Sequence, residues 1–283
     1  MIIVTGASGL IGNVLTKWLS INKNEFITIS RRDCNLAEMD LYDYITSLTS
    51  SVPSTIIHLA ANLPFGKNVT NGLKECEETK RIDLNVFNAS EAWNAKVIYA
   101  STLSLYNKFN SPPYSESSEL AEFDDNPYLK AKLIGESTFL RNSKNVVLRL
   151  PAPIGQGLPS ETVAGLFLEK AARNEIIEIW GSGLREQNYV DVEDIALAFI
   201  KVLHSEAQGI FNIASPEPTT MKDLAFLIVK IFQKGKVIFT DKSDAMGYQK
   251  ALYSCDKARI HFGWSHSISL ETSLRNLMSS YDN

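Results

Sequence analysis

The feature that most constrains the chain is a set of three evenly spaced glycines close to its N-terminus. Gly6, Gly9 and Gly12 follow an apolar run at residues 2–4, whose β-branched side chains predict a buried parallel strand. From residue 10 to residue 21 the apolar side chains recur with helical spacing. A glycine turn between a strand and a helix brings backbone N–H groups and the positive end of the helix dipole toward a phosphate. The sequence therefore predicts a dinucleotide pyrophosphate site at this turn.

Each glycine of this turn has a predicted role of its own. Gly6 takes backbone angles that other residues avoid, Gly9 lets the main chain approach a ligand, and Gly12 lets the helix pack close to the strand. The spacing is G-x-x-G-x-x-G, which differs from the commoner G-x-G-x-x-G. A tight turn that binds no ligand is the alternative interpretation.

The remainder of the chain alternates between strand and helix patterns. Short apolar runs predict strands at residues 26–29, 56–61, 96–100, 146–150, 176–180, 188–190, 209–213 and 237–239. Helical patterns occur at residues 40–48, 73–93, 162–172, 191–204, 221–232 and 270–278, and a further helix opens at residue 127. This alternation predicts an α/β fold, with a doubly wound parallel Rossmann sheet and a smaller interleaved C-terminal α/β domain. We expect residues 1–151 and 187–214 to form the dinucleotide-binding domain, and residues 152–186 and 215–283 to form a substrate-binding domain.

The composition narrows the class of protein. The 283 residues carry a formal net charge of -4 and no basic stripe, so nucleic acid is not an expected partner. No run approaches the roughly 18 apolar residues of a membrane span, and the first strand leaves no room for a signal peptide, so no membrane association is expected. The three cysteines are far apart and predict reduced thiols in the cytoplasm, and the four histidines lack metal-ligand spacing.

The end of the second predicted strand bears on the choice of nicotinamide cofactor. Folds of this type that prefer NAD place an acidic residue here, against the adenosine ribose. This chain has Ser30, Arg31 and Arg32 instead. Guanidinium groups pair with the additional phosphate of NADP, often in a bidentate manner. The sequence therefore favours NADP(H) over NAD(H), with two merely solvated surface arginines as the alternative.

Hydroxyl groups and a lysine indicate the chemistry. Thr102 follows a predicted strand, and Tyr128 and Lys132, four positions apart, share one face of the helix that opens at residue 127. Reduction of a carbonyl by hydride needs a proton donor, and a nearby ammonium would lower the pKa of a tyrosine toward the working pH. Thr102 could hydrogen-bond the carbonyl oxygen. Tyrosine and lysine at this spacing also arise by chance. The prediction of a catalytic pair therefore depends on their position after the glycine turn and the hydroxyl-bearing strand end.

Together these segments resemble the extended short-chain dehydrogenase/reductase superfamily, in its nucleotide-sugar epimerase, dehydratase and reductase branch. The resemblance covers nearly the whole chain and rests on residues 6–12, 58–61, 85–86, 101–102, 128–132, 189–194, 256–258 and 262–264. It implies that Tyr128 is the acid/base, that Lys132 binds the nicotinamide ribose and tunes Tyr128, and that Thr102 is the catalytic hydroxyl residue. Asn85 would lie in the helix behind the site.

The resemblance also implies a set of cofactor contacts and a homodimer. The cofactor contacts come from the glycine turn and the ends of the strands: Gly6, Ser8, Gly9, Leu10, Ile11, Arg31, Arg32, Asn35, Leu36, Leu59, Ala60, Ala61, Tyr128, Lys132 and Pro151. Members of this family often dimerise by pairing two helices, which match residues 73–93 and 127–141 of this chain. No metal is implied.

Within the branch, residues 30–36 look like the NADP-binding stretch of the GDP-fucose synthase group, and the passage that follows is also similar to that of dTDP-4-dehydrorhamnose reductases. The implied substrate is a nucleotide-diphosphate sugar with a keto group, commonly at C4 of a 6-deoxyhexose. The expected substrate contacts are Ser104, Ala152, Arg185 and Gln187. Family members usually have asparagine in place of Ala152 and arginine in place of Gln187, for which Arg185 could substitute.

Three hypotheses follow for the activity. The first is an NADPH-dependent reductase of a nucleotide-linked 4-keto-6-deoxy sugar in deoxysugar biosynthesis, favoured by the arginine pair. The second is a 4-epimerase, although such enzymes usually carry NAD and an acidic residue near position 30, which is absent. The third is a non-catalytic NADP sensor, against which the complete set of Thr102, Tyr128 and Lys132 argues. Leu103 stands where the family's dehydratases have glutamate, which argues against dehydration.

Overall fold

A six-stranded sheet forms the centre of the molecule. The computed structural model describes residues 1–62, 72–106, 111–122, 126–244, 247 and 249–281. The strand order is β10-β5-β4-β3-β1-β2, and every pair is parallel. The strands are β1 (Ile2–Thr5), β2 (Phe26–Ile29), β3 (Thr55–His58), β4 (Lys96–Thr102), β5 (Val146–Leu150) and β10 (Gly209–Asn212). The order runs outward from β1 in both directions, which confirms the predicted doubly wound α/β fold.

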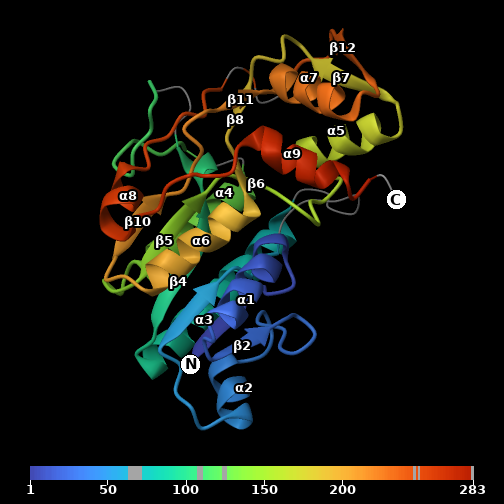
Figure 1. The fold of residues 1–283 in the computed structure, drawn as a ribbon. Coiled ribbons are helices and arrows are strands. Elements are labelled where there is room, and N and C mark those ends of the chain that lie inside the picture. The colour runs from blue at the N-terminus through green and yellow to red at the C-terminus, as the bar shows by residue number, and fades with distance from the viewer. Residues whose placement is uncertain (63–71, 107–110, 123–125, 245–246, 248, 282–283) are drawn as a thin grey trace.

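Helices cover both faces of this sheet (Figure 1). On one face lie α1 (Leu10–Ile21) and α6 (Val192–Leu203), whose apolar stripes pack on side chains such as Val4, Ile98 and Leu148. On the other face lie α2 (Leu41–Leu48), α3 (Leu73–Trp93) and α4 (Pro127–Phe139), packed on alternate strand residues such as Ile3, Val97 and Val147. Because successive strand residues point to opposite faces, two separate cores form around one sheet.

A smaller C-terminal α/β region lies beside the sheet, at the top of Figure 1. Its helices are α5 (Val163–Ala172), α7 (Met221–Phe232) and α9 (Leu270–Met278), and its strands include β7 (Ile176–Trp180) and β12 (Lys236–Thr240), which pair in parallel. These elements enclose a third apolar core around Leu168, Ile177, Leu224, Ile228 and Leu274. The region is completed by the short strands β6 (Ala152–Ile154), β8 (Glu186–Gln187), β9 (Tyr189–Asp191) and β11 (Thr219–Thr220).

The two regions are interleaved along the chain. Asn188 is buried between them: its side-chain amide donates to the carbonyls of Ser215 (2.8 Å) and Ala251 (3.2 Å) and accepts from the Ser215 N–H. Tyr189, in the stretch expected to belong to the dinucleotide-binding domain, packs into the C-terminal core. The domain boundaries at residues 151/152, 186/187 and 214/215 therefore stay a prediction.

Most helices begin where the sequence predicts, because a capping side chain marks the position. Asp40, Asn126, Thr162 and Thr220 each accept a backbone N–H from the first turn that follows. The sequence did not indicate α8 (Asp256–Phe262) or the 3-10 turn η1 (Leu103–Leu105) as helical. Both are too short for an apolar period to show.

In the glycine turn, the backbone at Gly6 and Gly12 packs directly against the backbone of neighbouring segments. Gly6 has φ +69°, and a Cβ there would meet the backbone N of Ala60 at 2.7 Å. A Cβ on Gly12 would meet the Cα of Ala7 at 2.7 Å. The strand, the turn and α1 can therefore come together only without side chains at these two positions.

We expect Gly12→Ala to lower the free energy of unfolding by about 1–3 kcal/mol, because the new methyl must displace the backbone of Ala7. Gly9→Ala is the matched control, since a Cβ there would meet only the Gly6 carbonyl oxygen, at 3.3 Å. Urea unfolding of both variants measures the difference. Equal midpoints would contradict the account of this turn.

Candidate active site

The predicted catalytic hydroxyls meet at the carboxyl end of β4. Thr102 ends that strand, and Tyr128 is the second residue of α4, whose first turn is capped by Asn126 and contains Pro127. A hydrogen bond joins the Thr102 and Tyr128 side chains. The Thr102 hydroxyl also accepts the backbone N–H of Ser104 at 3.2 Å, which fixes its position.

The Tyr128 hydroxyl is held in its protonated form. The residue is half-buried at the start of α4. This burial raises the pKa of Tyr128 to about 12, although the hydrogen bond with Thr102 acts to lower it. The predicted effect of Lys132 on the pKa of Tyr128 stays a prediction.

Lys132 lies one turn further along α4, with its ammonium directed at β4. Its Nζ donates to the Ala100 carbonyl at 2.8 Å and to the Tyr99 hydroxyl at 3.4 Å. The residue is 5% exposed. Burial lowers the pKa of Lys132, and the carboxylates of Asp83 and Glu136 act in the opposite direction.

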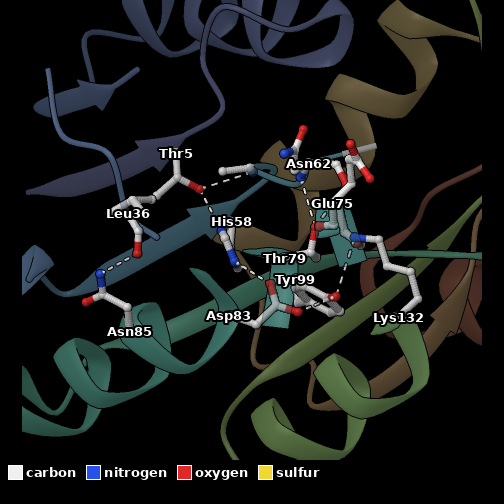
Figure 2. A network of polar contacts seen from close by, with 12 residues as sticks. Thr5, Leu36, His58, Asn62, Glu75, Thr79, Asp83, Asn85, Tyr99 and Lys132 are labelled. Carbon is white, nitrogen blue, oxygen red and sulfur yellow. Dashed lines mark hydrogen bonds and ion pairs between the residues drawn. The ribbon is translucent and has the colours of Figure 1, made fainter. Parts of the chain in front are cut away.

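A chain of buried polar side chains leads away from Lys132 (Figure 2). The Tyr99 hydroxyl donates to one oxygen of Asp83 at 3.0 Å, and His58 Nε2 contacts the other at 3.0 Å. His58 Nδ1 lies 2.6 Å from the Thr5 hydroxyl. Thr5 precedes Gly6 and accepts the Ala60 N–H at 3.3 Å. One network therefore joins the glycine turn to Lys132.

The predicted pyrophosphate contacts gather at the same edge of the sheet. Leu59, Ala60 and Ala61 follow β3, and the backbone of Leu59 and Ala60 lies against Gly6. Gly9 is the N-cap of α1 and provides no side-chain cap, unlike the residues that begin α2 and α4. The N-terminal turn of α1 thus keeps backbone N–H groups available for an anion, so the residues present fit a dinucleotide pyrophosphate.

The arginine pair follows β2 in an exposed turn. Arg31 and Arg32 are exposed, and neither forms an ion pair with a described residue. Asp33 is turned back onto Ser30, accepting its hydroxyl at 2.6 Å and its backbone N–H at 2.9 Å. These hydrogen bonds lower the pKa of Asp33. The turn therefore presents two cations and one carboxylate that is already hydrogen-bonded.

Asn85 lies in α3, and its side chain joins that helix to the segment after β2. Its side chain donates to the carbonyls of Leu36 (2.8 Å) and Met39 (2.7 Å) and accepts the Leu41 N–H (3.0 Å). It therefore ties α3 to the segment that contains Asn35 and Leu36, the residues expected beside the adenine. Leu36 itself is buried.

The expected substrate contacts lie on several elements. Ser104 is in η1 and exposed, Ala152 begins β6, and Gln187 ends β8. Arg185 is 12% exposed in its side chain and donates from Nε to Asp244 at 2.7 Å. A cavity of about 190 Å³ beside it is lined by Trp180, Gly181, Ser182, Gly183, Leu184, Arg185, Asp244 and Gly247. Arg185 thus borders a cavity, with one of its donors already used.

Sequence reasoning missed three members of the buried network, His58, Asp83 and Tyr99. A signal was present for two of them, since His58 ends an apolar strand and Asp83 follows Ile82 on the buried side of a helix. Cys76 was also missed as a neighbour of Tyr128, whose pKa it acts to raise. A polar residue within an apolar pattern predicts burial with a partner, but it does not name the partner.

Among the described residues, no group of three or more His, Cys, Asp and Glu side chains lies close enough to hold a metal ion. No helix in this part of the chain is long and apolar enough to cross a membrane.

The chain is similar to known proteins along most of its length. The model of the family "NAD dependent epimerase/dehydratase family" matches residues 2–214. A dTDP-4-dehydro-6-deoxyglucose reductase of Escherichia coli is 27% identical over 312 residues, covering 99% of this chain and 96% of that protein. A GDP-L-fucose synthase of Escherichia coli strain K12 is 25% identical over 308 residues, covering 96% and 94%.

The fold is also found among solved structures. The UDP-glucose 4-epimerase of Thermotoga maritima, crystallised with UDP-glucose, superposes with a TM-score of 0.85 at 23% identity and covers 99% of this chain and 98% of that one. The family match extends over most of the chain and includes the glycine turn, Thr102, Tyr128 and Lys132. The protein therefore belongs to the NAD-dependent epimerase/dehydratase family, a group within the extended short-chain dehydrogenases/reductases.

Proposed function

We propose that the protein is an NADPH-dependent reductase of a nucleotide-diphosphate-linked 4-keto-6-deoxy sugar. The observation that carries the proposal is the Tyr128 hydroxyl, which is hydrogen-bonded to Thr102 and has a pKa raised to about 12 by burial. A carbonyl reduction needs a positioned proton donor. The Tyr128 hydroxyl, hydrogen-bonded to Thr102, can be that donor.

Each side chain of the site has a role in this reaction. Bound NADPH would supply the hydride. Thr102 hydrogen-bonds the substrate carbonyl oxygen, and Tyr128 donates its proton to that oxygen as it becomes an alkoxide. Lys132 uses one N–H on the nicotinamide ribose while Ala100 and Tyr99 hold the other two.

The relatives support the class of substrate. Two of them are named for reduction or synthesis of nucleotide-linked deoxysugars, and both align along nearly their whole length. Arg185 would bind the substrate diphosphate beside its cavity, and Ser104, Ala152 and Gln187 would line the sugar side. We place the enzyme in deoxysugar biosynthesis, in the cytoplasm.

The turn after β2 supports NADP(H) as the cofactor. Arg31 and Arg32 are exposed, whereas the Asp33 carboxylate is engaged by Ser30. A 2′-phosphate would therefore meet two cations whose charges no described carboxylate pairs.

Oxidation of NADPH with a panel of dTDP-, GDP- and UDP-linked 4-keto-6-deoxy sugars tests the reaction. We expect one sugar to be reduced, and Tyr128→Phe to lower kcat by about 10²-fold or more, because the proton donor is lost. Absorbance of NADPH is the measurement, and NADPH affinity of the variant is the control. Conversion of a sugar without net NADPH consumption would instead identify a 4-epimerase, and NADPH binding without any conversion would favour a sensor.

Arg31→Ala and Arg32→Ala test the choice of cofactor. We expect each to weaken NADPH binding about tenfold, which is the scale of one charge-assisted hydrogen bond, and to leave NADH binding nearly unchanged. Lys17→Ala is the matched control, because Lys17 is also exposed but lies in α1. Fluorescence titration measures both affinities. An equal loss for NADPH and NADH would contradict the assignment.

The exposed apolar residues of α3 and α4 support the proposed homodimer. Leu84 is 49% exposed and Ile134 is 40% exposed, and their two helices pack side by side. We expect Leu84→Glu together with Ile134→Glu to give a monomer in light scattering, because paired copies would bury two like charges. Ile260→Glu, at a 72% exposed site in α8, is the control. A dimer that survives the double substitution would place the interface elsewhere.

A further inference from the structure

Lys132 carries a buried charge that needs a counter-charge. Its ammonium contacts a carbonyl oxygen, a phenol oxygen and, at 4.7 Å, the centre of the Tyr99 ring. None of these groups carries a negative charge. A buried ammonium without an anion nearby tends to lose its proton. A lysine that holds a ribose hydroxyl must keep both its proton and its position.

Two buried carboxylates raise the pKa of this ammonium group: Glu136 on α4 and Asp83 on α3. Glu136 is already held by other partners. Arg149 donates to both of its oxygens, at 2.9 and 2.7 Å, and the Ser101 hydroxyl donates at 2.5 Å. The charge of Glu136 is therefore balanced by the buried guanidinium of Arg149. Asp83 is the other carboxylate, and the described residues place no arginine or lysine in direct contact with it.

The Asp83 carboxylate is the acceptor in both of its side-chain hydrogen bonds, with Tyr99 and with His58. A carboxylate accepts only, so both the Tyr99 hydroxyl and His58 Nε2–H donate to it. His58 Nδ1 lies 2.6 Å from the Thr5 hydroxyl, which also accepts the Ala60 N–H. Because the Tyr99 hydroxyl gives its proton to Asp83, its oxygen is free to accept from Lys132. Each side chain from Thr5 to Lys132 therefore has a hydrogen-bond partner within this chain of contacts.

The packing allows Asp83 little freedom. A Cβ on Gly135 of α4 would lie 2.5 Å from an Asp83 oxygen and would also collide with the Tyr99 hydroxyl. The glycine thus lets α4 approach the Asp83–Tyr99 pair closely. Asp83 itself is 2% exposed, and His58 is 1% exposed. A buried network with all its partners in place keeps one geometry.

From these contacts we propose that Asp83 is a positioning residue for Lys132, which it holds charged and in place through the Tyr99 hydroxyl. This role rests on the proposed function, in which Lys132 binds the nicotinamide ribose. Through His58 and Thr5 the same carboxylate connects Lys132 to the strand that precedes the glycine turn, as Figure 2 shows. One continuous network would then reach both the pyrophosphate and the nicotinamide ribose of the cofactor.

The expected consequence is a change in the titration of Lys132. The ionisable groups around it are Asp83 and Cys76 on α3, Tyr99 on β4, Tyr128 and Glu136 on α4, His58 on β3 and Arg149 on β5. Burial lowers the pKa of Lys132, and the charges of Asp83 and Glu136 raise it. Once the charge of Asp83 is removed, only Glu136 opposes the effect of burial. We expect Asp83→Asn to lower the titration midpoint of Lys132 by at least about one pH unit.

NMR of protein labelled with [ε-¹³C]lysine measures this midpoint directly, with Lys132→Met identifying the signal. Tyr99→Phe should lower the midpoint by a smaller amount, because the carboxylate stays while the bridging hydroxyl is lost. Asp194→Asn is the matched control: Asp194 is also buried and accepts the backbone N–H groups of Ser267 and Ile268, so its loss should lower the melting temperature without moving Lys132.

An unchanged midpoint in Asp83→Asn would overturn the proposal. If that variant does not fold, Tyr99→Phe decides, and an unchanged midpoint there would overturn it equally. Affinity for NADPH is the second readout, and in Asp83→Asn its loss at alkaline pH should begin about one pH unit lower than in the unmodified protein. Neither readout needs turnover. A protein that reduces none of the sugars would refute the proposed function while the role of Asp83 is still tested.

Discussion

Close backbone packing at the carboxyl end of β1 is the constraint on which the rest of the site depends. Gly6 lies against the backbone that follows β3, and Gly12 lies against Ala7, so β1, α1 and β3 meet without side chains between them. Thr5, one residue earlier, is thereby brought within reach of His58 and Ala60. The same approach that leaves room for a pyrophosphate also begins the buried chain that ends at Lys132.

The residues predicted to bind the cofactor and those predicted to react lie along one edge of the sheet. The glycine turn and the arginine turn follow β1 and β2, and the Thr102–Tyr128 pair follows β4, with β3 between them. All lie at the carboxyl ends of parallel strands, where open α/β sheets bind their ligands. An extended dinucleotide can therefore reach from the exposed arginines to the Tyr128 hydroxyl. Burial at that end raises the pKa of the Tyr128 phenol.

The local sequence pattern predicted the helices and strands well, but it did not predict the buried polar network that joins Thr5 to Lys132. The bounds of α3 and α7 agree with the sequence because a long apolar period and flanking turn signals define each of them. Thr102 and Tyr128 were found because a strand end and a helix start have recognisable signals. The pairing of His58 with Asp83, 25 residues apart, and of Lys132 with Tyr99, 33 residues apart, depends on tertiary packing that no local spacing encodes. Lys132 was accordingly expected to act on Tyr128, whereas its described contacts are Tyr99 and Ala100.

Transfer of deuterium from the cofactor to the sugar tests the central claim most directly. The protein is incubated with NADPH deuterated at the transferable position of C4 and a 4-keto-6-deoxy nucleotide sugar, and the product is analysed by NMR and mass spectrometry. The account predicts one deuterium at C4 of the sugar for each NADP⁺ formed. A sugar that changes configuration without gaining deuterium, or deuterium that stays wholly in the cofactor, would contradict it.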